Sequence, residues 1–222
     1  MTDSIATILL VGGLSLLPLL LVVLSSYAKI AIVLTVLRNG IGAAGVPPNL
    51  VIAGVALLLS AFVLAPVASA VVSEMRPALE KVSSQEPTPS VERRAAAYLE
   101  AARAAGAPIR AFLMRHTRPE DRQAFVELAQ TLRGPGQPAV GSRSLLVLAP
   151  AFVVAELREA FVIGVAVLLP FLIVDLVVAN ILLALGLISL PVSSVSMPLK
   201  LALFVAVDGW RLLGLGLVAG YG

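Results

Sequence analysis

The sequence predicts an all-α membrane protein, and three observations support this fold class. First, 59% of the 222 residues are hydrophobic and only 13% are charged, against about 25% charged residues in an ordinary soluble domain. Second, the apolar residues form four long stretches, and about 20 apolar helical residues suffice to cross a bilayer core. Third, 19 of the 29 Asp, Glu, Lys and Arg residues lie in one insert. A soluble domain would spread its charge over every face, so most of this chain is predicted to avoid water.

The four stretches and the insert divide the chain into three regions. Residues 1–72 are predicted to form an apolar helical hairpin, and residues 145–222 a second one with a loop near residues 186–191. Residues 73–144 form the charged, partly helical insert, which we expect to be periplasmic. The apolar stretches themselves cover residues 5–36, 50–72, 145–188 and 199–218.

The first stretch is too long for one straight span. It would measure about 48 Å at about 1.5 Å per residue, against a hydrocarbon core of about 30 Å. We therefore expect it to tilt or to break at Gly12, Gly13 or Pro18. The residues before it contain no basic group, whereas a cleavable signal peptide usually begins with one. The first helix is therefore expected to be retained.

Prolines are expected to divide the later stretches. The stretch 145–188 holds 44 residues, so Pro150 and Pro170 should cut it into at least two helical pieces. Pro66 should end or kink the second stretch. Arg38 and Lys200 lie beside short connections, and the positive-inside tendency places them on the cytoplasmic side, with the insert and both termini on the other side.

The turn after the first stretch is rich in glycine and proline. Pro47 and Pro48 favour extended backbone before the next helix, and Asn49 is well placed to cap that helix. The motif residues of this turn are Arg38, Asn39, Pro47, Pro48 and Asn49.

The insert is predicted to contain three helices. The first two are expected over residues 91–105 and 109–116, where helix-favouring residues predominate. Thr117 followed by Glu120 resembles a capping box that starts a third helix with its body at 124–132. Residues 86–90, which contain two prolines, are expected to be flexible, and the glycine- and proline-rich residues 134–138 are expected to end the last helix.

The composition excludes several kinds of chemistry. The chain has no cysteine and one histidine, His116, so neither a thiolate site nor a His-paired metal site can form within one chain. It contains no phosphate-binding GxxxxGK[ST] loop. The net charge of +3 and the 5% aromatic content offer no basic stripe or stacking platform for nucleic acid. No enzyme activity and no cofactor are therefore predicted.

The most informative residues are the charges inside the apolar stretches. A charge in mid-bilayer costs from about 2.5 kcal/mol to well over 10 kcal/mol, so each should face a partner, a water cavity or another charge. Four of the eight are acidic and four basic, which suits pairing for ion-pair or assembly roles. They are Lys29, Glu156, Arg158, Glu159, Asp175, Lys200, Asp208 and Arg211.

The expected partners of two of these acids, Asp208 and Asp175, differ. Asp208 and Arg211 are three residues apart and can pair on one helix face. Asp175 has no basic residue within a turn, so its partner must come from another helix or another chain. As alternatives, Asp175 is a proton-relay carboxylate or a member of a structural ion pair, and the ion pair is favoured because Asn180 is the one other polar group nearby in sequence.

Two further features concern packing and loop structure. Gly216 and Gly220 have the GxxxG spacing that permits close helix approach, or else belong to a weakly packed tail. The segment between Gly186 and Pro191 should bend and present an apolar loop. In a ring of subunits this loop could form a hydrophobic constriction, and in a lone subunit a helix–helix corner. Its residues are Leu187, Ile188, Ser189 and Leu190.

Five blocks of sequence stand out in order along the chain. The first is SYAKIAIVLTVLRNGIG at residues 26–42, followed by PPN at 47–49. The others are FLMRHTR at 112–118, PAFVVAELREAF at 150–161, PFLIVDL at 170–176 and PLKLALFVAVDGW at 198–210. Together these blocks resemble the FliP/SctR family, whose members are core subunits of the flagellar and injectisome type III export apparatus.

The resemblance implies a structural, pore-forming subunit of an export gate that passes unfolded proteins across the bacterial inner membrane. It implies a homopentamer that winds with SctS/FliQ-like and SctT/FliR-like subunits into a helical, conical assembly, contacted by SctU/FlhB-like and SctV/FlhA-like components. Much of that assembly would project toward the periplasm. The energy would come from other components, an ATPase and the proton motive force.

The sequence departs from the family pattern at the loop. The family usually has a run of methionines there, described as a gasket around the pore, and this chain has Leu187, Ile188 and Ser189 instead. Ala155 replaces the usual hydroxyl residue, and Val162 replaces a residue that is usually polar.

The expected absence of a signal peptide favours the injectisome branch over the flagellar counterpart. The distant alternative is a self-sufficient ion-coupled transporter using Asp175 and Lys200, although no inverted repeat is visible.

Overall fold

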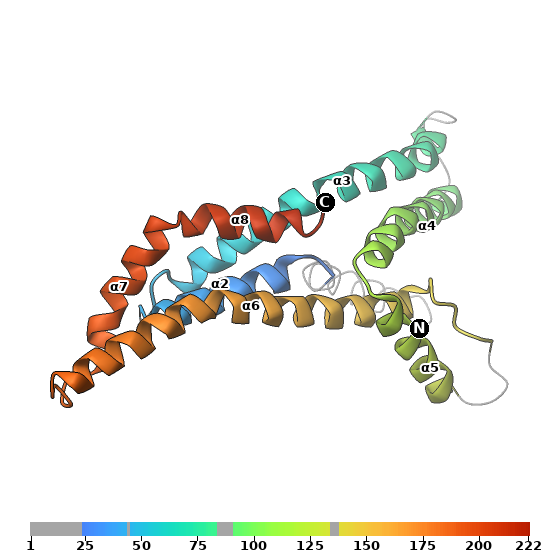
Figure 1. The fold of residues 1–222 in the computed structure, drawn as a ribbon. Helices are drawn as coiled ribbons and strands as arrows, with labels where there is room; N and C mark the ends of the chain where they lie inside the picture. Colours follow the sequence, from blue (N-terminus) through green and yellow to red (C-terminus); the bar gives the residue numbers. More distant parts are fainter. Residues whose placement is uncertain (1–23, 44, 84–90, 134–137) are drawn as a thin grey trace, which may run out of the picture. The chain divides into compact units, whose positions relative to one another are not determined.

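The computed structural model describes residues 24–43, 45–83, 91–133 and 138–222 (Figure 1). Within these ranges every regular element is an α-helix, which confirms the all-α class. The break points expected at Gly12, Gly13 and Pro18 and the segment 86–90 lie outside the described residues, as do residues 134–137 of the expected breaker 134–138. The helices are α2 (Tyr27–Ile41), α3 (Asn49–Ser83), α4 (Val91–Arg115), α5 (Pro119–Arg133), α6 (Leu145–Ala184), α7 (Val192–Ala206) and α8 (Gly209–Ala219).

The chain forms two compact units. The first consists of Met1–Val63 and Glu156–Gly222, and the second of Leu64–Ala155. Helices α3 and α6 each contribute to both units. The charges singled out in the apolar stretches all belong to the first unit.

Prolines interrupt the helices less than expected. Helix α6 is continuous over 40 residues and passes through Pro150 and Pro170, so the predicted cuts are wrong. Helix α3 likewise runs through Pro66, and α4 runs through Pro108 and joins the two helices expected at 91–105 and 109–116. An internal proline removes one backbone hydrogen bond, and the bonds on either side continue a helix held by its neighbours.

Two predicted helix caps are also wrong. The carbonyl of Pro48 accepts hydrogen bonds from the backbone N–H groups of Val51 at 2.9 Å and Ile52 at 3.2 Å. Pro48 thus occupies the cap position of α3, and the Asn49 side chain is bonded elsewhere. The Thr117 hydroxyl donates back to the Leu113 carbonyl at 2.6 Å, which leaves it at the end of α4.

The start of α5 follows a different sequence rule from the one expected. This helix begins at Pro119, a residue favoured at the first helical position because its missing N–H is not needed there. The acidic side chains of Glu120 and Asp121 lie in the first turn, where they complement the helix dipole.

The core of the first unit is built on one face of α2. Its buried residues recur at helical spacing and pack against Ala160 and Phe171 of α6, Phe204 of α7 and Leu217 of α8. Figure 1 shows α2 lying alongside α6. The buried apolar residues of α2 are Ile30, Val33, Leu34, Leu37 and Ile41.

Glycines allow α2 and α6 to approach closely. A Cβ atom at Gly40 would lie 2.6 Å from Cδ2 of Leu168, and one at Gly164 would lie 3.3 Å from Cγ1 of Val36. By contrast, a Cβ at Gly216 would meet nothing within 4 Å among the described residues. The close approach expected at the GxxxG of α8 is therefore absent from this part of the chain.

The second unit has its own small apolar core. Leu113 of α4 is buried together with Val147, Leu148 and Phe152 near the start of α6. The rings of Phe112 and Phe152 lie 5.7 Å apart. The expected insert boundaries, residues 73–144, remain a prediction.

Two helical segments are long and apolar enough to cross a membrane, Asn49–Ala78 of α3 and Leu145–Ala184 of α6. Helices α7 and α8 would together form a third such span if the 62° bend between them is accepted within one span. The first apolar stretch is described only from residue 24 onward, so the fourth predicted span is not tested.

Candidate functional site

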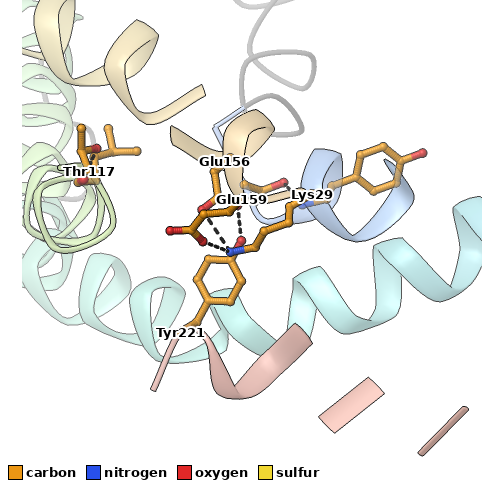
Figure 2. A network of polar contacts seen from close by, with 8 residues as sticks. Lys29, Thr117, Glu156, Glu159 and Tyr221 are labelled. Carbon is orange, nitrogen blue, oxygen red and sulfur yellow. Dashed lines mark hydrogen bonds and ion pairs between the residues drawn. The ribbon is translucent and has the colours of Figure 1, made fainter. Parts of the chain in front are cut away.

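One cluster of charge lies buried between α2, α6 and the residues after α8. The Lys29 ammonium donates to Glu159 Oε2 at 2.9 Å and to Glu156 Oε1 at 3.4 Å. It also lies 3.9 Å from the centroid of the Tyr221 ring, and the Tyr221 hydroxyl donates to Glu156 (Figure 2). We call these four residues the Lys29 cluster.

The Lys29 cluster solves the problem of burying charge in an apolar unit. The side chains of Lys29 and Glu156 are 2% and 3% exposed, and a buried charge is tolerated only when it is paired and hydrogen-bonded. The Tyr221 ring adds a cation–π contact to Lys29, and its hydroxyl satisfies the second oxygen of Glu156. Burial raises the pKa of Tyr221, so this hydroxyl stays protonated and remains a donor.

A second pair ties α7 to α6 and α2. The Lys200 ammonium lies 2.6 Å from Asp175 Oδ2 and donates to the Gly40 carbonyl at 3.0 Å. Of the two sources expected for the partner of Asp175, another helix or another chain, the structure places a lysine of another helix beside it. Gly40 lies in the last turn of α2, where carbonyls lack intrahelical partners and a cation is favoured.

Asp208 and Arg211 pair as predicted, but in a different setting. Their charged atoms lie 4.0 Å apart, and both side chains are well exposed, 65% for Asp208 and 75% for Arg211. Asp208 does not lie on a helix face: it occupies the break before α8, with a left-handed φ of 50°. The expectation of one shared helix face is therefore wrong.

The break itself is fixed by an aromatic contact. A Cβ at Gly209 would lie 2.2 Å from the ring of Phe204, so this position accepts glycine alone without rearrangement. The Phe204 ring also meets the Trp210 ring edge-on at 5.4 Å. These contacts hold α7 and α8 at their 62° bend.

Arg158 differs from the other predicted charges. Its side chain is exposed on α6, and it makes no ion pair with any residue of the described chain. Its neighbours one helical turn away, Val154, Phe161 and Val162, are exposed too. The structure thus places a cation within an apolar surface.

The glycine- and proline-rich turn is closed by Arg38. Its guanidinium donates to the Pro47 carbonyl at 3.4 Å and to the side-chain oxygen of Asn49. Gly42 and Gly45 have φ angles of 81° and 76°, which glycine adopts without strain. An open pocket at this turn is lined by Arg38, Asn39, Gly42, Ala43, Gly45, Pro48 and Asn49.

The apolar loop lies between α6 and α7, where the chain reverses direction (Figure 1). Gly186 has a φ of 74°, and α7 begins directly after Pro191. Ile188 is 82% exposed, and Leu187, Ser189 and Leu190 are exposed as well. Four consecutive residues, three of them large and apolar, thus lie on the surface of this unit.

Sequence reasoning missed three residues of these clusters. Tyr221 is a single aromatic residue far from the charges in sequence, and no pattern links it to them. Gly40 and Gly164 lie on different helices, so neither forms a spacing motif. His116 is half-buried and contacts the Phe112 ring, and no metal-ligating group of three side chains occurs in the part of the chain that is described.

Comparison with known proteins identifies the family. The model of the FliP family matches residues 10–217. The chain is 44% identical over 209 residues to pathogenicity-related ORF2 of Xanthomonas campestris pv. glycines, covering 94% of this chain and 92% of the relative. It is 42% identical over 213 residues to the flagellar biosynthetic protein FliP of Pectobacterium carotovorum subsp. carotovorum, covering 96% and 76%.

A third relative comes from a secretion system. The chain is 41% identical over 215 residues to the hypersensitivity response secretion protein HrcR of Ralstonia nicotianae, covering 96% of this chain and 95% of the relative. With a family model that matches nearly the whole chain and relatives above 40% identity at almost full length, this protein belongs to the FliP family.

Proposed function

We propose that this protein is a structural subunit of a type III export gate that passes unfolded proteins across the bacterial inner membrane, and that it acts without catalysis. The observation that carries the proposal is the family match over residues 10–217. The buried ion pairs support it, because they hold long apolar helices in one defined arrangement, as a structural subunit requires.

The proposed assembly is a homopentamer combined with SctS/FliQ-like and SctT/FliR-like subunits and contacted by SctU/FlhB-like and SctV/FlhA-like components. Apolar surface supports an assembly: 36 large hydrophobic residues of the described chain are exposed, and several of them, including Leu187, Ile188 and Leu190, lie outside all three candidate spans. The insert, residues 73–144, is proposed to lie on the periplasmic side, with part of the complex projecting there.

The loop between α6 and α7 is proposed to seal the gate. Its exposed apolar side chains, Leu187, Ile188 and Leu190, would converge in a ring of subunits and exclude water. Ser189 interrupts the apolar surface. The loop therefore offers a hydrophobic constriction built from branched aliphatic side chains in place of methionine.

We favour an injectisome over a flagellar apparatus because a relative named for the hypersensitivity response and one named for pathogenicity match at 41% and 44% identity. The flagellar relative is as similar, at 42%, so the flagellar counterpart is the second candidate. Complementation separates the two. The gene should restore substrate secretion in a strain lacking its injectisome homologue and leave a non-motile strain without its flagellar homologue non-motile.

The decisive test is the mass of the assembled complex. Co-expressed with its two small partner subunits and extracted in detergent, the chain should give a complex containing five copies by native mass spectrometry. A chain that remains a monomer in the presence of both partners would contradict the proposal.

A self-sufficient transporter remains the distant rival. The direct ion pair between Asp175 and Lys200, at 2.6 Å, favours a structural role for both. Liposomes containing the purified chain alone should show no proton-linked uptake. Uptake that disappears in Asp175→Asn would favour the rival instead.

A further inference from the structure

The charges of the first unit fall into two groups. Lys29 and Lys200 each lie within 3.0 Å of a carboxylate oxygen, and Arg38 is held by two oxygen acceptors. Arg211 has Asp208 at 4.0 Å. Among the cations that the structure describes in this unit, Arg158 alone makes no contact with an acceptor.

The surroundings of Arg158 make an unpaired state costly. It belongs to α6, a helix apolar enough to cross a membrane, and it lies on an exposed apolar ridge with Val154, Phe161, Val162 and Val165. A charge in such a place is expected to have a partner. None of the described residues supplies that partner.

Among the acids that the structure describes in the same unit, Asp208 has the weakest contact with a cation. Glu159 and Asp175 already bind lysines at 2.9 Å and 2.6 Å, whereas Asp208 has one contact at 4.0 Å and is 65% exposed. Apolar side chains surround it as they surround Arg158, namely Val205, Val207 and Trp210, all exposed. Both surfaces are apolar around a single charge, and the two charges have opposite sign.

We infer that Arg158 of one copy pairs with Asp208 of a second copy of this chain. Each copy carries both halves of the contact, one on α6 and one at the break between α7 and α8. Because the two halves are different surfaces, the contact is head-to-tail. Such contacts produce rings or helical arrays, not two-fold dimers. The inference rests on the proposed function, since it names residues that join the copies of the gate.

The left-handed backbone of Asp208 contributes to this arrangement. A φ of 50° is tolerated by aspartate better than by most residues. It places the carboxylate at the outside of the bend while Gly209 packs inward against Phe204. The bend is thus what exposes the acid on the surface of the unit.

Charge exchange tests the pair. Arg158→Asp and Asp208→Arg, each made alone in the co-expressed complex, should lower the yield of five-copy assemblies at least tenfold by native mass spectrometry. The double variant should recover a substantial part of that yield. Arg158→Lys, which keeps the charge, should assemble, and Arg211→Gln, which removes another exposed cation of the same unit, should reduce assembly less than twofold.

Cross-linking tests the same contact without relying on rescue, because the chain contains no cysteine. In Arg158→Cys/Asp208→Cys, oxidation should produce a ladder of dimers and larger species. Arg158→Cys/Gly54→Cys should produce none. A ladder absent from correctly assembled complexes, or a cross-link to a different subunit, would overturn the inference and leave the proposed function intact. A wild-type chain that never assembles would instead defeat the proposed function.

Discussion

The Lys29 cluster and the ridge around Arg158 use the same kinds of residue in opposite ways. In the cluster, side chains from α2, α6 and the residue Tyr221 meet inside one chain, and Lys29 and Glu156 are almost completely buried. On the ridge, Arg158 lies between Glu156 and Glu159 in the sequence of α6, yet its side chain is exposed among apolar side chains. Charges in these apolar helices therefore serve two purposes. Those completed within the chain fix its fold, and those left incomplete mark where another chain belongs.

The largest effect is expected when the cluster loses its cation. Lys29→Met leaves Glu156 buried without its lysine, which should cost about 3–5 kcal/mol of stability. The double variant Lys29→Met/Glu156→Leu removes both charges and should be much less destabilised. Thermal unfolding of the detergent-solubilised protein measures both. Equal loss in the single and double variants would mean that pairing is not what Lys29 contributes.

A smaller effect should follow when the hydroxyl of Tyr221 is removed. Tyr221→Phe keeps the ring beside Lys29 and deletes the hydrogen bond to a buried carboxylate, a bond of a type that contributes about 1.5–3 kcal/mol. Tyr221→Ala also loses the cation–π contact and should be less stable still. The same unfolding measurement applies, with Tyr98→Phe, an exposed tyrosine, as the control. Wild-type stability in Tyr221→Phe would contradict the assigned hydrogen bond.

The bend between α7 and α8 should respond to a single methyl group. Gly209→Ala forces a carbon into the ring of Phe204 and should destabilise by about 1–3 kcal/mol. Gly214→Ala in the same helix meets nothing within 4 Å and should be neutral or slightly stabilising, because alanine favours helix. If both variants lose stability equally, the packing of Phe204 does not explain the glycine.

Substitutions in the loop between α6 and α7 should change stability least. They should instead change the conductance of the assembled gate. Ile188→Gly and Leu187→Gly remove exposed side chains, so stability should change by no more than about 0.5 kcal/mol. In the assembled gate, however, each should raise the leak of small ions across a planar bilayer, because a hydrophobic constriction is widened. Ser189→Gly is the matched control. Unchanged conductance in normally assembled Ile188→Gly and Leu187→Gly would refute the sealing role.

Much of this protein could be read from its sequence. The segregation of charge predicted an all-α membrane class, and the sequence blocks at 26–49, 112–118, 150–161, 170–176 and 198–210 predicted the family. These features depend on composition and order, which do not change on folding. The reversal after Gly186 was also predictable, because glycine and proline act on the backbone where they stand.

Predictions made from single residues were wrong where the surrounding helix determined the local structure. Pro150 and Pro170 do not cut α6, since each removes one hydrogen bond from a helix that many others stabilise. The Thr117 hydroxyl donates to the Leu113 carbonyl at 2.6 Å, so it closes the end of α4 and does not cap α5. Both predictions considered a single residue and left out the backbone hydrogen bonds of the helix around it.

The partners of the charges were decided by the tertiary structure alone. The sequence named Lys29, Glu156 and Glu159 as candidates for pairing, but 127 positions separate Lys29 from Glu156. Nothing in either segment states that they meet, or that Tyr221 joins them. Pairing over such distances depends on how α2 packs on α6, which Gly40 and Gly164 permit by the absence of a side chain. Sequence sets which groups need a partner in an apolar setting, and the packing of the helices determines which partner each one finds.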